Sequence, residues 1–169
     1  MTEPIISVTE PDWSREKKSF FEWSPSKSLL ASIRSYQRQQ NTHFLLGWVF
    51  KKVAVIQHRF WSVVTGAEIP INSQIGGGLL IPHPNGIVIH PAASIGPNCL
   101  ILQQVTIGVG ASDGFPEIGG HVDIGAGAKV LGAIKIGNHA KIGANAVVLI
   151  DVPEGQTAVG IPAKLLSKK

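Results

Sequence analysis

The chain has 169 residues, enough for one globular domain with a small appended element, and its 44% hydrophobic and 15% charged residues exclude general disorder. The net charge of +4 is dilute, and the basic residues form neither a run nor a stripe, so nucleic-acid binding is not expected. A single cysteine, Cys99, excludes an intrachain disulfide and fits a reducing cytoplasm. It occupies a small-residue slot and is predicted to be a core residue.

The first residues give no sign of export or membrane insertion. The segment MTEPIISVTEPDW has acids and prolines where a signal peptide needs a basic start and an apolar run. The most apolar stretch, Phe44 to Val64, contains Lys51, Lys52 and Arg59, which a bilayer-spanning helix does not accommodate cheaply. We therefore expect a cytoplasmic protein without an integral membrane segment.

Residues 1–66 are predicted to form a short α-helical segment. Apolar residues recur at intervals of three and four in Ser26 to Gln40 and in Phe44 to Val64, which is typical of amphipathic helices. Ser24 or Ser26 is a candidate cap of the first helix, and Gly66 is a candidate end of the second. We interpret the aromatic face of these helices as core or subunit contact, with a ligand surface as the alternative. Apolar positions of the second helix include Trp48, Val49, Val53, Ile56, Phe60 and Val64.

Residues 67–169 carry a repeat of period six. A helix cannot keep such residues on one side, whereas three short strands per coil can, so we predict a mainly β prism of about eighteen residues per coil around an aliphatic column. Glycine after the aliphatic residue is expected to let the backbone turn at the corners. Small residues follow at Ser73, Cys99, Ala128, Ala140 and Ala146. The aliphatic runs are Ile69, Ile75, Ile81 and Ile87; Ile89, Ile95, Ile101 and Ile107; and Ile118, Ile124, Val130, Ile136, Ile142 and Val148.

Two interruptions of the repeat are candidate functional segments, because each must have a reason in an otherwise regular solenoid. The first is the turn Pro84-Asn85-Gly86 directly after His83, and the second is the segment 108–117, which skips a corner and must project from the prism. Pro82 and Pro84 fix the backbone on both sides of His83, so the imidazole is held outward as a general base requires. An ordinary proline turn and a harmless corner insertion are the alternatives.

From Glu68 to its end the sequence resembles the serine acetyltransferase family of hexapeptide-repeat acyltransferases. The resemblance implies a left-handed parallel β-helix, commonly a homotrimer, that moves an acetyl group from acetyl-CoA to a hydroxyl. It implies no metal, and a zinc-hydrolase alternative would need three convergent histidines, for which residues 83, 121 and 139 supply no close ligand pair. The matching stretches are HPNGIVIHPAASIG, LILQQVTIG, IGAGAKVLGAIKIGNHAKIGANAVVLIDVPEG and TAVGIPAKLL.

The resemblance also implies roles for individual residues. It makes His83 the catalytic base and Glu68, where the family has Asp, the carboxylate that orients the imidazole. The backbone N–H groups of Gly108 and Val109 are expected to stabilise the oxyanion. Small residues and one lysine that could meet a phosphate are expected to line the groove for the CoA arm. These are Ala126, Ala128, Gly143, Ala144 and Lys164.

The acceptor-binding residues depart from the family's pattern. Pro82 stands where an acid normally precedes the histidine, and Gly114-Phe115 stands where the family has an Arg-His pair. Without a guanidinium to clamp a carboxylate, we predict a sugar hydroxyl of a surface polysaccharide or its precursor as the acceptor, with Phe115 stacking on the ring and Asp113 nearby. L-Serine is the alternative acceptor, and a structural β-solenoid scaffold is the alternative to an enzyme.

Further features bear on partners. The helical segment is about half the length of the family's usual N-terminal domain, so a lone homotrimer is expected. The ending SKK lacks the isoleucine-ended tail by which family members dock on cysteine synthase, so no such complex is expected. His90, His121 and His139 are interpreted as surface residues and not as parts of the site.

Overall fold

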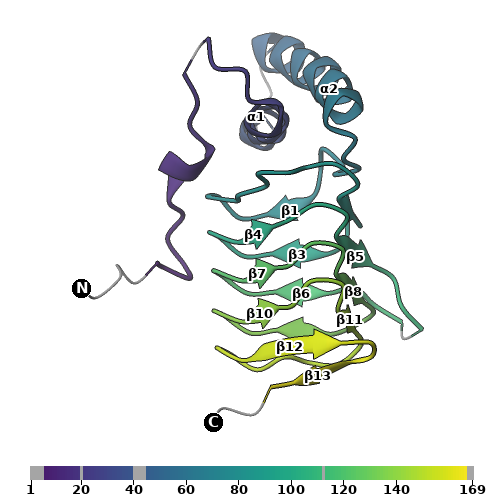
Figure 1. The fold of residues 1–169 in the computed structure, drawn as a ribbon. Helices are drawn as coiled ribbons and strands as arrows, with labels where there is room; N and C mark the ends of the chain where they lie inside the picture. The colour runs from purple at the N-terminus through teal and green to yellow at the C-terminus, as the bar shows by residue number, and fades with distance from the viewer. Residues whose placement is uncertain (1–5, 20, 40–44, 112, 167–169) are drawn as a thin grey trace.

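The computed structural model places two helices at one end of a column of short strands (Figure 1). α1 spans Pro25–Gln39 and α2 spans Leu45–Thr65, which confirms both predicted helices; the predicted ends Gln40 and Phe44 lie outside the described residues. A short 3-10 helix, η1 (Trp13–Glu16), belongs to residues 6–19, which we call the strap. We call α1 and α2 the helical cap and residues 67–166 the prism. The structure describes residues 6–19, 21–39, 45–111 and 113–166.

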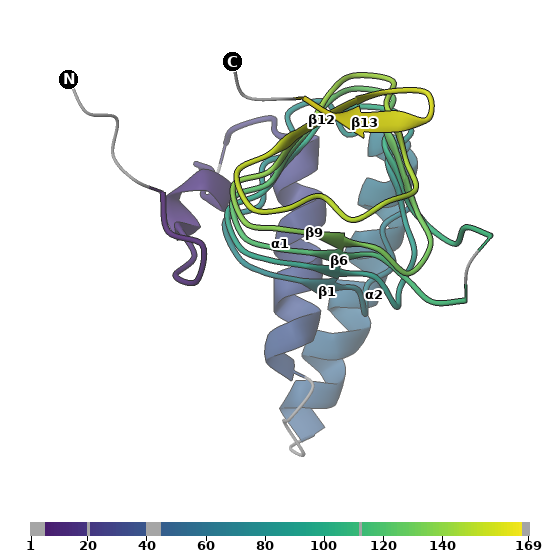
Figure 2. The same cartoon turned by 90° about the horizontal axis from the view of Figure 1, so that it is seen from below.

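The prism consists of three sheets that share one core, and seen from below it has a three-sided outline (Figure 2). Neighbouring strands pair in parallel, except that β13 pairs antiparallel to β12 at the C-terminal end of the prism. Sheet I contains β1 (Gln74–Ile75), β3 (Ser94–Ile95), β6 (Glu117–Ile118) and β9 (Lys135–Ile136). Sheet II contains β4 (Leu100–Ile101), β7 (Asp123–Ile124), β10 (Lys141–Ile142), β12 (Thr157–Gly160) and β13 (Ala163–Leu165). Sheet III contains β2 (Val88–Ile89), β5 (Thr106–Gly108), β8 (Lys129–Leu131) and β11 (Val147–Val148).

The register of the strands confirms the predicted coil length and both interruptions. Lys135 pairs with Glu117, a separation that equals the predicted regular coil. Ser94 pairs with Gln74 across a slightly longer coil, because the chain between them contains the turn at His83. Asp123 pairs with Leu100 across a coil that is longer still, because it contains the projecting segment, which leaves the prism outline in Figure 2.

The aliphatic column lies inside the prism as predicted. All fourteen repeat positions are at most 5% exposed, and the small residues four positions later are buried too. Burial of about 25 cal/mol per Å² of apolar surface along the whole column makes it the main source of stability. Cys99 is fully buried, and burial raises the pKa of its thiol to about 11, which confirms it as an unreactive core residue.

The predicted reason for the repeat glycines needs correction. A Cβ added to Gly96 would lie 2.5 Å from the carbonyl carbon of Gly119 in the next coil, and one added to Gly76 would lie 2.6 Å from the nitrogen of Pro97. Neither glycine has the positive φ that would require it. These positions are therefore glycine because adjacent coils approach too closely for a side chain, and not because the chain turns there.

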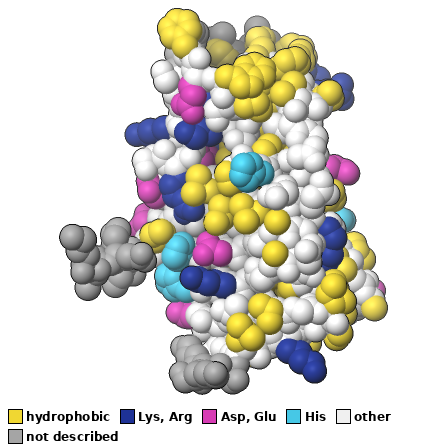
Figure 3. Space-filling view, in the orientation of Figure 1, with side chains coloured by type: hydrophobic (Ala, Val, Ile, Leu, Met, Phe, Trp, Pro, Cys, Tyr) yellow, Lys and Arg dark blue, Asp and Glu magenta, His cyan; other side chains and the backbone are white. Residues whose placement is uncertain are grey.

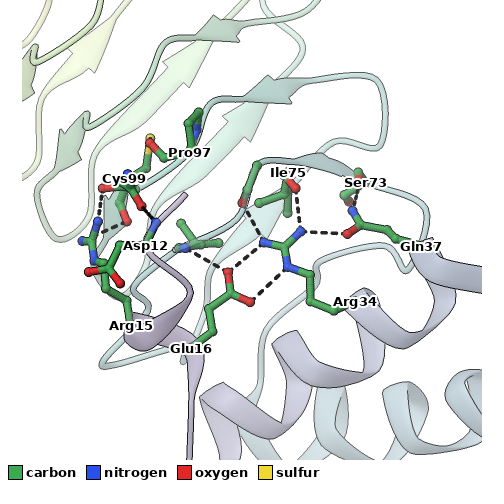
Figure 4. Close-up of polar contacts among 12 residues, drawn as sticks. Asp12, Arg15, Glu16, Arg34, Gln37, Ser73, Ile75, Pro97 and Cys99 are labelled. Carbon is green, nitrogen blue, oxygen red and sulfur yellow. Dashed lines mark hydrogen bonds and ion pairs between the residues drawn. The ribbon is translucent and has the colours of Figure 1, made fainter. Parts of the chain in front are cut away.

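The strap clamps the helical cap to the prism through a buried ion pair (Figure 4). The guanidinium of Arg34, on α1, donates to the Glu16 carboxylate at 2.9 and 3.0 Å and to the carbonyls of Ile75 and Gly76 at 2.6 Å. Both charged side chains are only 8% exposed. Glu16 in turn accepts the Leu79 N–H at 3.0 Å, so one network joins strap, cap and first coil.

A second attachment of the strap uses one buried amide. Asn98 is fully buried in a corner of the prism with φ of 62°. Its Oδ1 accepts the Asp12 N–H at 2.7 Å, and its Nδ2 donates to the carbonyls of Ser7 and Glu10 at 2.8 Å. Asparagine suits this place because it tolerates the left-handed backbone and offers both donors and an acceptor.

Of the two roles expected for the aromatic face, core or subunit contact, several of its residues do not serve the core of this chain. Trp48 is 60% exposed, Phe60 56% and Trp23 75%. Trp61 is half-buried and packs against the core, with edge-to-face contacts to Trp23 and Phe60, and Tyr36 on α1 is half-buried as well. These exposed aromatic residues leave the subunit contact as the standing prediction for this face. Within the described residues, no helix meets the length and hydropathy needed to cross a membrane.

Candidate active site

His83 lies in a bulge at the corner between sheets II and III. Leu80 bridges to Leu100 before the bulge, and the Gly86 N–H bonds to the Gly66 carbonyl at 2.8 Å after it, so the extra residues leave the coil between these two points. Pro82 and His83 are both exposed. The imidazole therefore points outward, as the flanking prolines predict.

A pocket of about 370 Å³ opens beside His83, between the bulge and the helical cap. Its cap side is formed by the start of α1 and the end of α2, where Gly66, with φ of +64°, ends the helix as predicted. A Cβ on Gly66 would lie 2.7 Å from Asn85 Nδ2, so a side chain here would displace Asn85, and the positive φ itself favours glycine. The lining residues are Pro25, Ser26, Val64, Thr65, Pro82, His83, Pro84 and Asn85.

Several of these pocket residues were not singled out from the sequence. Ser26 and Thr65 reach the pocket only because the two helices pack on the bulge. A contact between separate elements of this kind cannot be predicted from the local sequence pattern. The sequence does indicate a turn at Asn85, since Asn-Gly is typical of turns. Its Oδ1 accepts a hydrogen bond from Gln104 in the next coil at 3.0 Å, which fixes the bulge.

Glu68 lies one coil before β2, at the cap end of the prism. It bridges in parallel to Val88, its N–H donates to the Ile87 carbonyl at 2.8 Å, and its exposed side chain emerges on the sheet III face. Among the residues that the structure describes, no hydrogen bond or ion pair joins the Glu68 carboxylate to the His83 ring. The orienting role of Glu68 stays a prediction.

The projecting segment starts at the opposite edge of sheet III. Gly108 is buried at the end of β5, and Val109 beyond it is 58% exposed. Phe115 stacks on His90 with ring centroids 4.4 Å apart and an interplanar angle of 13°. His90 Nδ1 accepts the Ala92 N–H at 3.2 Å, so its ring is held in place. His90 was interpreted as a simple surface residue, but it supports the loop that carries the predicted acceptor-binding side chains. Asp113 lies in this loop and is exposed.

Most of the predicted CoA residues share the His83 corner. Ala126 and Ala144 lie between sheets II and III, one coil apart, and both reach the surface at least in part. Gly143 follows β10, whose partner β12 places Val159 beside it, and Val159 pairs with the exposed Lys164 of β13. A Cβ on Gly143 would lie 2.8 Å from the Val159 side chain. A groove with a lysine at its end is therefore compatible with this corner.

Ala128 is the exception among these residues. It is fully buried, and its side chain belongs to the core. Its carbonyl accepts the Thr106 N–H at 2.9 Å and its N–H donates to the Gly125 carbonyl at 3.2 Å. The prediction that its side chain lines the CoA groove is wrong, because the small residue serves the packing between coils.

The candidate site residues of one chain thus form two groups. The first surrounds His83, and the second surrounds Gly108 and the projecting segment, across the width of sheet III. Five strand residues at about 3.3 Å each separate the corner at Gln104 from Val109 by roughly 15 Å. A small acceptor cannot contact both groups in one chain.

The other histidines form a pair that the sequence patterns did not reveal. His121 and His139 occupy equivalent positions in consecutive coils, and their Nδ1 atoms lie 2.8 Å apart. The pKa of His121 is lowered, mainly because burial disfavours the charged imidazole. The charge of Asp123 opposes this shift, and the charge of His139 adds to it. His83 lies at another corner, and among the described residues no group of three or more His, Cys, Asp or Glu side chains could hold a metal ion.

Known proteins resemble this chain along most of its length. A serine acetyltransferase of Staphylococcus xylosus is 40% identical over 158 residues, which are 88% of this chain and 73% of that protein. The chain spans about half the length of several other serine acetyltransferases, 54% and 45% in two examples. No protein-family model matches the chain.

Solved structures agree with the sequences. Soybean serine acetyltransferase complexed with serine has a TM-score of 0.67 and 39% identity, over 84% of this chain and 56% of that one. A serine acetyltransferase in complex with CoA has a TM-score of 0.67 and 38% identity, over 85% of this chain and 58% of that one. Relatedness at this level over both sequence and fold leads to one conclusion: the chain belongs to the serine acetyltransferase family of hexapeptide-repeat proteins.

Proposed function

We propose that the chain is an acetyl-CoA-dependent serine O-acetyltransferase. The observation that carries the proposal is the bulge that holds His83 outward beside a pocket, in a member of this family. The relatives reported above are serine acetyltransferases, and solved structures of such enzymes hold serine or CoA. These similarities do not support the polysaccharide acceptor that the sequence patterns favoured, so L-serine takes its place.

The chemistry uses His83 as general base. Its neutral imidazole removes the proton of the acceptor hydroxyl while the oxygen attacks the thioester carbonyl of acetyl-CoA. The tetrahedral oxyanion is stabilised by the N–H groups of Gly108 and Val109. As it collapses, the C–S bond breaks and the CoA sulfur receives the proton from the imidazolium. Glu68 is proposed to stabilise that imidazolium, and neither an acyl-enzyme nor a metal is required.

The two groups of site residues suggest how the site is completed. Because they lie at opposite edges of sheet III, we infer that the His83 corner of one copy meets the Gly108 loop of another. The homotrimer and the left-handed coil rest on the family resemblance, as does the division into a helical segment (1–66) and a catalytic prism (67–169). Light scattering should give a molecular mass of three chains, and a monomer that is fully active would contradict the shared site.

A thiol-release assay tests the function. Acetyl-CoA with L-serine should give turnover, and the His83→Ala variant should lose on the order of 10²- to 10⁴-fold in kcat while keeping its fold. Lys135→Ala, an exposed change on sheet I away from both groups of site residues, is the matched control and should retain activity. Turnover that is unchanged in His83→Ala would reject the base.

The acceptor is decided in the same assay with a panel of sugars. The loop offers Gly114-Phe115 in place of a cation, and Phe115 is 38% exposed with one ring face on His90. Turnover of a sugar without turnover of serine would restore the sequence-based prediction. Turnover of serine alone would require another cation to bind its carboxylate.

A further inference from the structure

His121 and His139 stand in consecutive coils at the corner between sheets I and II. Both have a left-handed backbone, with φ of 53° and 57°. The backbone is fixed at each, since the His121 N–H donates to the Pro97 carbonyl at 2.8 Å and the His139 N–H donates to the Gly120 carbonyl at 3.0 Å. Stacking of the coils thus holds the two side chains beside each other.

Histidine is an unusual residue for this backbone conformation. By the register of the strands, the equivalent positions in the other coils are Gly78, Asn98 and Gly155, and all three have positive φ as well. Glycine adopts this conformation without strain, and the amide of Asn98 is needed by the strap. A histidine is strained here and offers nothing to the backbone in return, so the pair has another reason.

The two rings meet through their Nδ1 atoms. These atoms lie 2.8 Å apart, and the ring planes are inclined by 79° with centroids 5.0 Å apart, so the rings do not stack. Two neutral imidazoles share one proton in such a contact, one ring donating and the other accepting. The same nitrogens can bind one metal ion instead, with the proton of each ring then carried on Nε2.

The distance between the nitrogens favours one coordination geometry. Imidazole nitrogen binds a divalent first-row ion at about 2.0–2.1 Å, so two ligands at a right angle have nitrogens about 2.9 Å apart, and two at the tetrahedral angle about 3.3 Å apart. The observed 2.8 Å matches the right angle. Right angles are typical of the tetragonal and square-planar sites of Ni²⁺ and Cu²⁺, whereas Zn²⁺ prefers the tetrahedron.

The surroundings leave space for the remaining ligands. Both histidines are partly exposed, so water can complete the coordination. Asp123 favours a cation beside His121, and Arg15 and Lys141 oppose one, so nitrogen ligation and not local charge has to supply the affinity. The space-filling view shows histidine side chains at the surface with acidic and basic side chains beside them (Figure 3).

This corner stays accessible in the homotrimer inferred above. There the His83 corner of one copy meets the Gly108 loop of another, and both lie at the edges of sheet III. In a three-sided prism the corner between sheets I and II lies opposite sheet III, so the pair faces away from that contact (Figure 2). Because both histidines belong to one chain, the pair is also complete without any neighbour.

We propose that the Nδ1 atoms of His121 and His139 bind one divalent transition-metal ion of the Ni²⁺ or Cu²⁺ class, which joins two consecutive coils of the prism. His83 lies at another corner, so the ion takes no part in acetyl transfer. The proposal is therefore independent of the proposed function.

Isothermal titration with Ni²⁺ tests the proposal on the full 169-residue chain without an affinity tag. After metal has been removed with EDTA and the EDTA dialysed away, the parent should bind one Ni²⁺ per chain, and Zn²⁺ should bind more weakly. His121→Asn and His139→Asn should each bind Ni²⁺ at least about tenfold more weakly, since loss of a mere outer partner of a ligating histidine already has about that effect. Asparagine tolerates the left-handed backbone, so both variants should keep the circular dichroism of the parent.

The matched control is His90→Asn. It removes another partly exposed imidazole, at a different corner, and should bind Ni²⁺ as the parent does. In urea denaturation, Ni²⁺ at about a hundred times its Kd should shift the equilibrium of the parent about a hundredfold toward the folded state, and should not shift that of His121→Asn. Absence of Ni²⁺ binding by the parent, equal binding by the parent and the two variants, or loss of binding in His90→Asn would overturn the proposal. Tighter binding of Zn²⁺ than of Ni²⁺ would overturn the right-angle geometry.

Discussion

The prism and the helical cap place their apolar side chains in opposite ways. Every aliphatic repeat residue of the prism is at most 5% exposed, whereas the apolar stripe of α2 is 44–84% exposed. This stripe consists of Val49, Val53, Ile56, Phe60 and Val63. Each coil finds its partner in the next coil of the same chain, so the column is complete by itself. The cap finds no such partner for its apolar stripe among the described residues of the chain. The apolar side chains of the prism are therefore satisfied within one chain, whereas those of α2 are not.

Separating the cap from the prism should have the largest effect. Arg34→Ala should lower the free energy of unfolding by about 3–5 kcal/mol, because it leaves the Glu16 carboxylate buried without its cation. Urea denaturation measures this loss. The double variant Arg34→Met/Glu16→Leu should recover much of it, and an Arg34→Ala protein as stable as the parent would show that the clamp is dispensable.

Removing the same side chain from each region sharpens the contrast. Ile101→Ala, in the fully buried column, should lower the free energy of unfolding by about 2–5 kcal/mol because it leaves a cavity. Ile56→Ala, at a site 68% exposed, should change it by no more than about 0.5 kcal/mol. Both values come from urea denaturation of the free chain, and similar losses for the two variants would mean that Ile56 is covered within the protein.

Within the prism, two glycines distinguish the steric cost of an added side chain from the cost of a left-handed backbone conformation. Gly96→Ala should lower the free energy of unfolding by about 1–3 kcal/mol, since its Cβ would meet backbone atoms of the next coil at 2.5 Å. Gly155→Ala, with φ of +65° and nothing within 4 Å, should cost about 1 kcal/mol from strain alone. Chemical denaturation compares them, and the reverse order would refute the close approach of coils as the reason for the repeat glycines.

The smallest expected effect is a pH dependence at the joint of cap and prism. Burial lowers the pKa of His58 below its ordinary value of 6.5, so the unfolded chain binds more protons just below that pH. The free energy of unfolding should therefore fall as the pH drops below 6.5. His58→Gln should flatten this slope. His121→Asn should also flatten the slope, because burial lowers the pKa of His121 in the prism as well. A slope unchanged in both variants would exclude these two histidines.

Period six in the sequence was sufficient to predict the prism. Because side chains alternate in a strand and three strands close one coil, the spacing determines which residues face the axis, and Ile101 or Val130 could be placed in the core without any tertiary information. The same regularity exposed the breaks at Pro84-Asn85-Gly86 and at residues 108–117. Predictions of this kind depend only on local geometry repeated many times.

Contacts between different elements were beyond such reasoning. The amphipathic pattern of α2 predicts two faces but does not say whether the apolar one meets the same chain or another subunit. His121 and His139 become neighbours only when consecutive coils stack, which gives them a 2.8 Å contact. In the pocket, Ser26 and Thr65 join His83 through packing of the cap, and Asn98 holds a strap from the distant start of the chain.

The unequal coil lengths have a consequence for how such a protein can change. Ile101 stays in register with Ile124 although their coil carries the projecting segment, and Gln74 stays in register with Ser94 although theirs carries the bulge at His83. The column thus tolerates extra residues at its corners without altering its own packing. Corner segments are therefore separable from the scaffold. Under the proposed function, exchanging one is expected to alter acceptor preference while the molecule folds as before.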